Sequence, residues 1–302
     1  MQGLERRYGE RTALAAIDLH MARGEILGLL GPNGAGKTTC LQVLSGNLLP
    51  TAGTVQIHGI DLSRRPRHAK RHIGYLPERP PLYPEMRVDE YLAYCARLHR
   101  VPRLSLGKAI DRVKGRCGLA EVGRRLVGRL SKGYRQRVGI AQAIIHEPDL
   151  VILDEPTDGL DPVQIREVRE LVRSLAASSG VILSSHILPE VQAVCTRVVI
   201  LRDGRALHEE RLDKDPPTLP VLRYRVRLDR PPSLTTITAL PGIAAAQTLG
   251  DDAFRVTLRP GETPAALAER LVEAGYGLVE LTPDRADLEQ VFFDILGGGR
   301  AE

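Results

Sequence analysis

The chain has 302 residues, 43% of them hydrophobic and 26% charged, a composition that is ordinary for a globular protein. That length exceeds what one small core needs, so we expect two domains. No apolar run approaches the roughly 18 residues that span a bilayer, and residues 1–7 lack the apolar centre of a signal peptide. This argues against a membrane-spanning or secreted protein, and we expect the chain to stay in the cytoplasm.

The net charge of +5 is unevenly distributed. Residues 1–215 carry 33 Lys and Arg against 25 Asp and Glu, whereas residues 216–302 carry 9 against 12. Basic clusters at residues 64–71 and 100–137 could attract nucleic acid or an anionic membrane. No aromatic residues alternate with the basic ones as base-stacking platforms would require, so we favour a solvated surface. The four cysteines are isolated and are expected to be buried or idle thiols: Cys40, Cys95, Cys117 and Cys195.

The first predicted elements are two strands. Residues 4–8 are typical of the end of a strand, and residues 12–21 alternate apolar and polar positions as a half-buried strand does. Tyr8 is the one aromatic residue before the glycine-rich stretch that follows. Two interpretations of Tyr8 stay open: it stacks on an adenine ring, or it packs at a strand end.

A glycine-rich stretch between an apolar run (26–30) and a helix-compatible segment (39–48) is the clearest motif. Its glycines let successive N–H groups and a helix N-terminus point at the phosphates of a nucleotide. Lys37 adds positive charge toward the β and γ phosphates, and the Thr38 hydroxyl is suited to Mg²⁺, which prefers oxygen ligands. The phosphate-binding loop comprises Gly31, Pro32, Asn33, Gly34, Ala35, Gly36, Lys37, Thr38 and Thr39.

The next segment combines short strands with a helical insertion. We expect strands at 53–59 and 72–77, the second of which stops at Pro77 and is followed directly by Glu78. Apolar residues then recur at helical spacing from Val88 to Leu98, and a basic, helical subdomain continues to Val127. Ser131 is a good N-cap for a helix that runs to about His146. An anion could approach this helix start beside Gly133, although an ordinary cap is the alternative.

Two carboxylates close a buried parallel strand at 150–153: Asp154 and Glu155. Such strand ends face the ligand crevice of an α/β sheet, which puts both acids near the phosphates. Asp154 fits the Mg²⁺-ordering role of phosphate-loop enzymes, and Glu155 can polarise an attacking water. The next strand, 181–184, leads to His186, which the strand order brings into the same crevice.

A hairpin at 198–208 completes the first domain (1–212), and residues 213–220 are interpreted as a linker. Residues 221–302 form a second, smaller domain with strands and helices in the order βαββαβ and one added helix at 288–296. That order predicts a ferredoxin-like α+β module. Nothing in it suggests catalysis.

Together these stretches resemble the nucleotide-binding subunit of an ATP-binding cassette (ABC) transporter, over residues 4 to about 210. The resemblance implies a P-loop α/β cassette with an antiparallel β subdomain and an inserted α-helical subdomain. It implies an ATPase that needs Mg²⁺ and forms a head-to-tail dimer, either a homodimer or with another ABC ATPase, with ATP in the interface. The partner implied is an integral-membrane permease, which would hold the chain at the cytoplasmic side of the inner membrane.

The resemblance also assigns roles to single residues. Tyr8 stacks on adenine, residues 31–39 bind phosphates, Asp154 orders Mg²⁺ with Thr38, and Glu155 is the general base. His186 contacts the γ-phosphate, Ser131 and Gly133 contact the ATP held by the partner chain, and Asp161 communicates across the dimer. Glu78 stands where the family has a glutamine near the metal, and Leu130-Ser131-Lys132-Gly133-Tyr134 replaces the usual L-S-G-G-Q.

Two branches of the family share features with the chain. Leu76-Pro77-Glu78, Pro81-Leu82-Tyr83 and residues 130–137 are similar to gliding-motility and nitrous-oxide-reductase maturation ATPases, and residues 288–292 resemble an extension of drug and lipid exporters. The rival hypothesis is a soluble ABC-type ATPase acting on nucleic acid or the ribosome. Such proteins normally carry two cassettes or a long coiled coil, which this chain lacks, so we expect an exporter subunit with no nucleic-acid partner.

Overall fold

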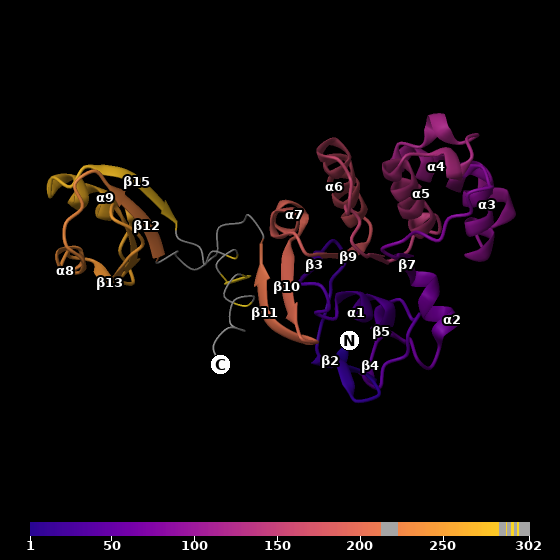
Figure 1. The fold of residues 1–302 in the computed structure, drawn as a ribbon, viewed down its shortest axis with the longest axis horizontal. Helices are drawn as coiled ribbons and strands as arrows, with labels where there is room; N and C mark the ends of the chain where they lie inside the picture. Colours follow the sequence, from indigo (N-terminus) through magenta and orange to yellow (C-terminus); the bar gives the residue numbers. More distant parts are fainter. Residues whose placement is uncertain (213–222, 284–287, 289–290, 293–294, 296–302) are drawn as a thin grey trace. The chain divides into compact units, whose positions relative to one another are not determined.

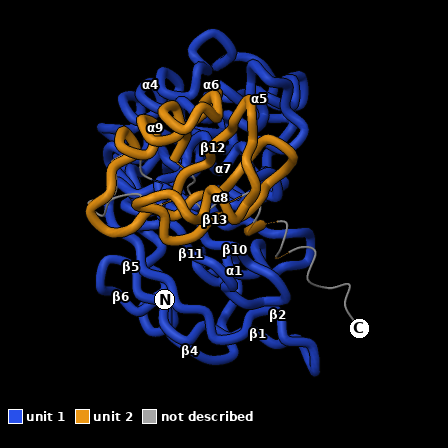
Figure 2. The backbone as a smooth tube through the Cα atoms, turned by 90° about the vertical axis from the view of Figure 1, so that its left-hand side faces the viewer, with its two compact units in different colours: residues 1–213 blue, residues 214–302 orange. Residues whose placement is uncertain are grey.

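The computed structural model describes residues 1–212, 223–283, 288, 291–292 and 295. The chain forms two compact units, Met1–Asp213 and Lys214–Glu302, each with its own hydrophobic core (Figures 1 and 2). The predicted linker at 213–220 and most of the predicted helix at 288–296 lie outside the described residues. In the part of the chain that is described, no helix is long and apolar enough to cross a membrane.

The central sheet of the first unit has the strand order β11-β10-β3-β9-β8-β7. Strands β7, β8, β9, β3 and β10 pair in parallel, and β11 is antiparallel to β10. The carboxyl ends of the parallel strands therefore meet at one edge, as the sequence predicted. Its strands are β3 (Ile26–Leu30), β7 (Ile73–Leu76), β8 (Leu150–Leu153), β9 (Gly180–Ser185), β10 (Arg197–Arg202) and β11 (Arg205–Arg211).

One face of this sheet packs on helix α1 (Lys37–Leu44) and on an antiparallel sheet of order β2-β1-β4. Alternate apolar residues of the central strands, such as Leu27, Leu29 and Ile182, join this core. The antiparallel sheet comprises β1 (Gln2–Tyr8), β2 (Arg11–Ile17) and β4 (Ala52–Thr54), and the hairpin beside it comprises β5 (Gln56–Ile57) and β6 (Ile60–Asp61).

The opposite face is covered by helices α6 (Pro162–Ala176) and α7 (Leu188–Val194). Gly28 allows the close approach of α7, because a Cβ there would lie 2.6 Å from the Val191 side chain. Helices α3 (Val88–Leu98), α4 (Leu106–Cys117) and α5 (Lys132–Ile144) pack together as the inserted subdomain (Figure 1). The remaining helical segments of this unit are the short α-helix α2 (Pro66–Ala69) and the 3-10 helices η1 (Lys70–His72), η2 (Arg103–Ser105), η3 (Ala120–Val122) and η4 (Val127–Arg129).

Several predicted boundaries are wrong for local reasons. The strand expected at 53–59 is two strands, because β4 pairs with β1 whereas β5 pairs with β6. The helix expected to reach residue 48 ends at Leu44, where Gly46 takes a left-handed conformation (φ 71°) and closes it. The strand expected at 12–21 ends at Ile17, after Ala16 with its positive φ of 52°. All four cysteines are buried and form no disulfide, and all lie within the described residues.

The second unit has the predicted element order. Its sheet order is β13-β14-β12-β15, with antiparallel neighbours, which is the ferredoxin-like arrangement. Alternation along β12 buries Tyr224, Val226 and Leu228 and exposes the arginines between them. The elements are β12 (Arg223–Leu228), α8 (Leu234–Thr238), β13 (Ile243–Thr248), β14 (Ala253–Leu258), α9 (Pro264–Glu273) and β15 (Leu278–Pro283).

Candidate nucleotide-binding site

A pocket of about 660 Å³ opens at the carboxyl edge of the central sheet. It brings together residues from six separate stretches of the sequence, among them the whole predicted phosphate loop after Gly31. Its lining within the described residues is Tyr8, Arg11, Thr12, Ala13, Pro32, Asn33, Gly34, Ala35, Gly36, Lys37, Thr38, Thr39, Glu78, Glu155, Asp158, His186, Asp203 and Gly204.

The phosphate loop curls between β3 and α1 with glycines where side chains would be strained or would clash. Gly36, the N-cap of α1, has φ 104°, and a Cβ there would lie 2.7 Å from the carbonyl oxygen of Ala13. Gly34 has φ 84° and open space around the position of a Cβ. The loop therefore presents bare backbone and a helix N-terminus to the pocket, the arrangement that binds phosphate.

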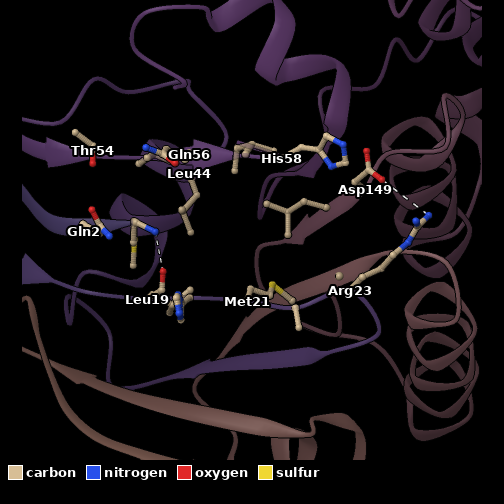
Figure 3. A pocket seen from close by; sticks show the side chains of 16 residues that line it. Gln2, Leu19, Met21, Arg23, Leu44, Thr54, Gln56, His58 and Asp149 are labelled. Carbon is tan, nitrogen blue, oxygen red and sulfur yellow. Dashed lines mark hydrogen bonds and ion pairs between the residues drawn. The ribbon is translucent and has the colours of Figure 1, made fainter. Parts of the chain in front are cut away.

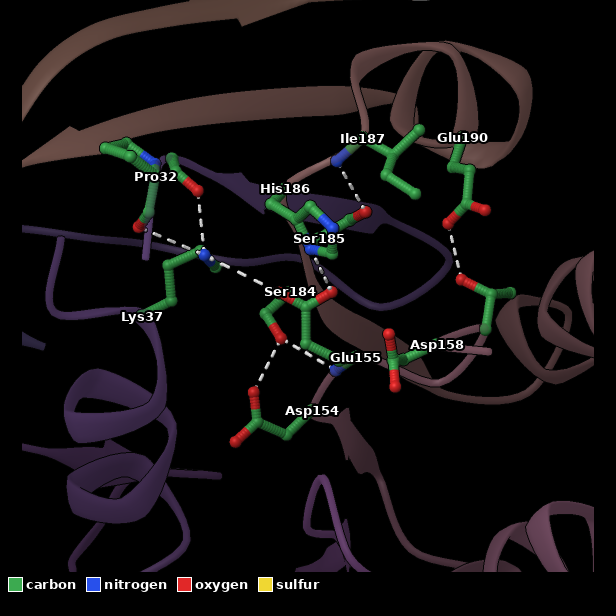
Figure 4. Close-up of polar contacts among 12 residues, drawn as sticks. Pro32, Lys37, Asp154, Glu155, Asp158, Ser184, Ser185, His186, Ile187 and Glu190 are labelled. Carbon is green, nitrogen blue, oxygen red and sulfur yellow. Dashed lines mark hydrogen bonds and ion pairs between the residues drawn. The ribbon is translucent and has the colours of Figure 1, made fainter. Parts of the chain in front are cut away.

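Lys37 is almost fully buried and is held in place by the loop itself. Its Nζ donates to the carbonyl oxygens of Gly31 at 2.7 Å and Pro32 at 3.3 Å, and lies 3.5 Å from Oε1 of Glu155 (Figure 4). The Lys37 ammonium is thus surrounded by carbonyl and carboxylate oxygens of the loop and of Glu155. An anion entering the pocket can take the place of the Glu155 contact, since that contact is an ion pair longer than a hydrogen bond.

Asp154 is fully buried beneath the loop and has one carboxylate oxygen without a partner. Its Oδ1 accepts hydrogen bonds from the hydroxyls of Ser184 at 2.6 Å and Thr38 at 3.3 Å. Its Oδ2 is buried and has no hydrogen-bond donor among the described residues. Burial raises the pKa of Asp154; the two hydroxyl hydrogen bonds oppose this rise, and the charges of Glu155 and Glu78 add to it.

An unpaired buried carboxylate oxygen is costly unless a cation compensates it. Thr38 and Asp154 offer two hard oxygen ligands at the point where a nucleotide's phosphates would enter, so the residues fit Mg²⁺. Glu78, the third predicted metal ligand, is exposed after the end of β7 and lines the same pocket.

Glu155 adopts a left-handed backbone conformation (φ 45°) directly after Asp154. Its backbone N–H donates to the Ser184 hydroxyl at 2.9 Å, and its Oε2 lies 3.1 Å from Nδ1 of His186. The structure therefore brings Glu155, His186 and Lys37 together, and dashed lines in Figure 4 join Glu155 to each of the other two. Non-glycine residues with positive φ are uncommon and concentrate at functional sites.

Tyr8 ends β1 at the rim of the pocket, with 46% of its surface exposed. The Arg6 guanidinium lies over its ring, 4.5 Å from the ring centroid. A flat ligand can stack on the face of the Tyr8 ring that Arg6 does not cover, and stacking on adenine stays a prediction.

Ser131 and Gly133 lie at the start of α5. Ser131 caps the helix by accepting from the N–H of Tyr134, and Gly133 is covered by the Gln164 side chain, 2.4 Å from where a Cβ would be. Lys132 between them forms an ion pair with Asp158 at 3.3 Å. Within the described residues neither Ser131 nor Gly133 lines the pocket that contains Lys37.

Two groups that hold the residues of the site in place were missed from the sequence. Ser184 joins Asp154 to Glu155, and its only sequence signal was a hydroxyl inside an apolar strand. Behind the site, the Thr157 hydroxyl donates a hydrogen bond to the buried carboxylate of Glu190 on α7, a helix that was not predicted. This contact fixes the turn after Glu155 to α7.

These features define a P-loop nucleotide-binding cassette. A family profile described as ABC transporter matches residues 14–158. The bacitracin transport ATP-binding protein BcrA of Bacillus licheniformis is 33% identical over 299 residues, which are 98% of this chain and 96% of that protein. The daunorubicin resistance ATP-binding protein DrrA3 of Streptomyces coeruleorubidus is 33% identical over 305 residues, 99% and 96% of the two chains.

Among solved structures, an ATP-binding subunit of an ABC transporter superposes with a TM-score of 0.65 at 32% identity, covering 70% of this chain and 89% of that one. The chain therefore belongs to the ABC transporter family. It is an ATP-binding subunit of a transporter, and an ATPase.

Proposed function

We propose that the chain drives export through a separately encoded permease, on the cytoplasmic side of the membrane, as a head-to-tail dimer with Mg²⁺-ATP at two shared sites. The observation that carries the proposal is the Lys37–Glu155–His186 cluster above the unpaired Oδ2 of Asp154. Two relatives that match nearly the whole chain are named for bacitracin transport and daunorubicin resistance, which supports export of an antibiotic-like compound.

Each residue's part follows from its contacts. Residues 31–39 bind the phosphates through backbone N–H groups. The Lys37 ammonium gives up its ion pair with Glu155 and contacts phosphate oxygens instead. Thr38 and Asp154 hold Mg²⁺, with Glu78 beside them. Mg²⁺ held there would neutralise charge on the phosphate oxygens and so favour attack of water at the γ-phosphorus.

Glu155, released from Lys37, accepts the proton of the attacking water at Oε1. His186 keeps its hydrogen bond to Oε2, so the carboxylate is held in one orientation while it acts as a base. Ser184 fixes the backbone beneath it. Tyr8 completes the site by stacking on the base of the nucleotide.

Ser131 and Gly133 serve the site of the opposite chain in this proposal. Neither residue lines the pocket of its own chain, which supports this, because a helix N-terminus such as that of α5 can bind an anion. The finer resemblance to gliding-motility and nitrous-oxide-reductase maturation ATPases stays a prediction.

Mixed dimers test the shared sites. Lys37→Ala and Ser131→Arg chains should each be nearly inactive as pure dimers. Mixed, they form one site with both defects and one with neither, so ATPase activity should return to as much as about half that of the parent per mixed dimer. If mixed dimers form, as shown by two different affinity tags, and no activity returns, the sites are not shared.

A second variant tests the base. Glu155→Gln should bind Mg²⁺-ATP and hydrolyse it at least about a hundredfold more slowly, since general-base catalysis contributes roughly 10²–10⁴ in rate. His68→Ala, an exposed histidine on α2, is the control. Parental turnover in Glu155→Gln would assign the proton transfer to another group.

A further inference from the structure

Three side chains of types that can ligate a metal gather at the edge of the central sheet opposite the nucleotide pocket. His58 lies in the turn between β5 and β6, His72 directly precedes β7, and Asp149 directly precedes β8. Each offers one ligand atom, and these atoms all lie within 4.8 Å of one another. Asp149 is five residues before Asp154, so the cluster is about 16 Å along the strand from the nucleotide site, at about 3.3 Å per residue.

The backbone holds the three residues in this arrangement. Ile57 pairs with Ile60, so His58 and Gly59 form a two-residue hairpin turn with positive φ at both positions (53° and 75°). The turn places the His58 ring parallel to the His72 ring, with centroids 5.0 Å apart. His72 Nδ1 lies 2.6 Å from Oδ2 of Asp149, and Figure 3 shows His58 directed toward the same carboxylate.

Two imidazoles and a carboxylate are the ligand set of zinc-type ions, whereas Mg²⁺ prefers oxygen ligands alone. Ligands of a tetrahedral Zn²⁺ at about 2.0–2.1 Å lie about 3.3 Å apart. The widest separation in the group therefore has to shorten by at most about 1.5 Å, while the 2.6 Å contact between His72 and Asp149 has to lengthen by about 0.7 Å as the metal replaces their hydrogen bond. His58 is exposed and His72 and Asp149 are half-buried, so all three side chains have room for such small rotations. A pocket of about 540 Å³ that His58 and Asp149 line leaves room for water in a fourth coordination position.

A neighbouring arginine competes with a metal ion for Asp149. The Arg23 guanidinium lies 3.9 Å from Oδ1 of Asp149, but its side chain is 71% exposed. An exposed ion pair of this length is worth little and yields readily to a metal ligand bond.

We propose that His58, His72 and Asp149 form a binding site for a divalent transition metal of the zinc type, separate from the Mg²⁺-ATP site. The bound ion ties the β5–β6 hairpin to the beginnings of β7 and β8, the strands that lead to Glu78 and Asp154. Because the three ligands come together only in the folded chain, the ion stabilises the first unit by mass action.

The test uses Co²⁺ and Zn²⁺ on the full chain, stripped with EDTA and free of nucleotide. We expect isothermal titration to show one equivalent of each ion at this site, a rise in melting temperature, and Co²⁺ absorption bands without thiolate charge transfer. His58→Asn keeps the turn, because asparagine tolerates positive φ, and Asp149→Asn keeps the shape of the acid. Each should weaken binding at least about tenfold.

Matched controls separate this site from others. Arg23→Gln should tighten metal binding, and His68→Ala should leave it unchanged. Unchanged affinity in His58→Asn and Asp149→Asn would overturn the proposal. So would loss of binding in His186→Ala alone, because that result would place the ion in the nucleotide pocket.

Discussion

Ser184 connects the two acids of the site, and replacing it by alanine tests that connection. The hydroxyl is fully buried, donates to Oδ1 of Asp154 at 2.6 Å and accepts from the N–H of Glu155 at 2.9 Å. A hydrogen bond to a charged group contributes roughly 1.5–3 kcal/mol, and a buried N–H left without an acceptor costs roughly 1–3 kcal/mol. Ser184→Ala should therefore lower the free energy of unfolding by about 2.5–6 kcal/mol.

Ser185→Ala is the matched control, one residue along the same strand. Ser185 is also buried, but its hydroxyl accepts only from the half-buried N–H of Ile187 at 3.0 Å. That neutral bond is worth about 0.5–1.5 kcal/mol. Urea unfolding of the first unit measures the free energy of unfolding of both variants, and the two values can be compared directly when their m-values are equal.

The same substitution has a functional consequence. Loss of the Ser184 hydrogen bond should raise the pKa of Asp154 further, because that bond favours the charged form. As the pH is lowered, the Mg²⁺-dependent affinity for ATP should then begin to fall at a higher pH in Ser184→Ala than in the parent. If Ser184→Ala costs no more stability than Ser185→Ala and leaves the pH dependence of Mg²⁺-ATP binding unchanged, the proposed link between the acids is wrong.

Three further predictions concern single charged groups. Burial raises the pKa of Asp154, so its ionised form destabilises the nucleotide-free fold at pH 7. In thermal scans, Asp154→Asn should therefore melt at a higher temperature than the parent without nucleotide, but should lose the extra stabilisation that Mg²⁺-ATP gives the parent. Burial, with the charge of His99, lowers the pKa of His146 to about 4, so its contribution to stability is complete above about pH 6.5 and is lost as pH falls toward 4. His146→Gln should remove about 2–3 kcal/mol of this acid sensitivity in urea titrations at pH 7 and pH 4. Glu78→Gln should keep ATPase activity but reduce the ratio of ATP affinities with and without Mg²⁺; an unchanged ratio would place Glu78 in solvent rather than beside the metal.

Locally encoded features could be predicted from the sequence. The phosphate loop was predicted from the spacing of glycines between a strand and a helix. Strand β8 was predicted from an apolar run that is followed by Asp154 and Glu155. Helix α3 has the predicted bounds, Val88–Leu98, because apolar residues recur on one face of it. The crevice that collects Lys37, Glu155 and His186 followed from one general rule, that parallel strands end at the same edge of a sheet.

Only the tertiary structure decided which distant groups touch. Ser184 meets Asp154 because β9 lies beside β8, and His58 meets Asp149 across 91 residues because a hairpin turn reaches the start of β8. Helix α7 escaped prediction because its seven residues are too few to show a helical period, and packing against β3 stabilises it. Contacts of this kind depend on strand order and on side-chain packing, which residue spacing along a single chain does not encode.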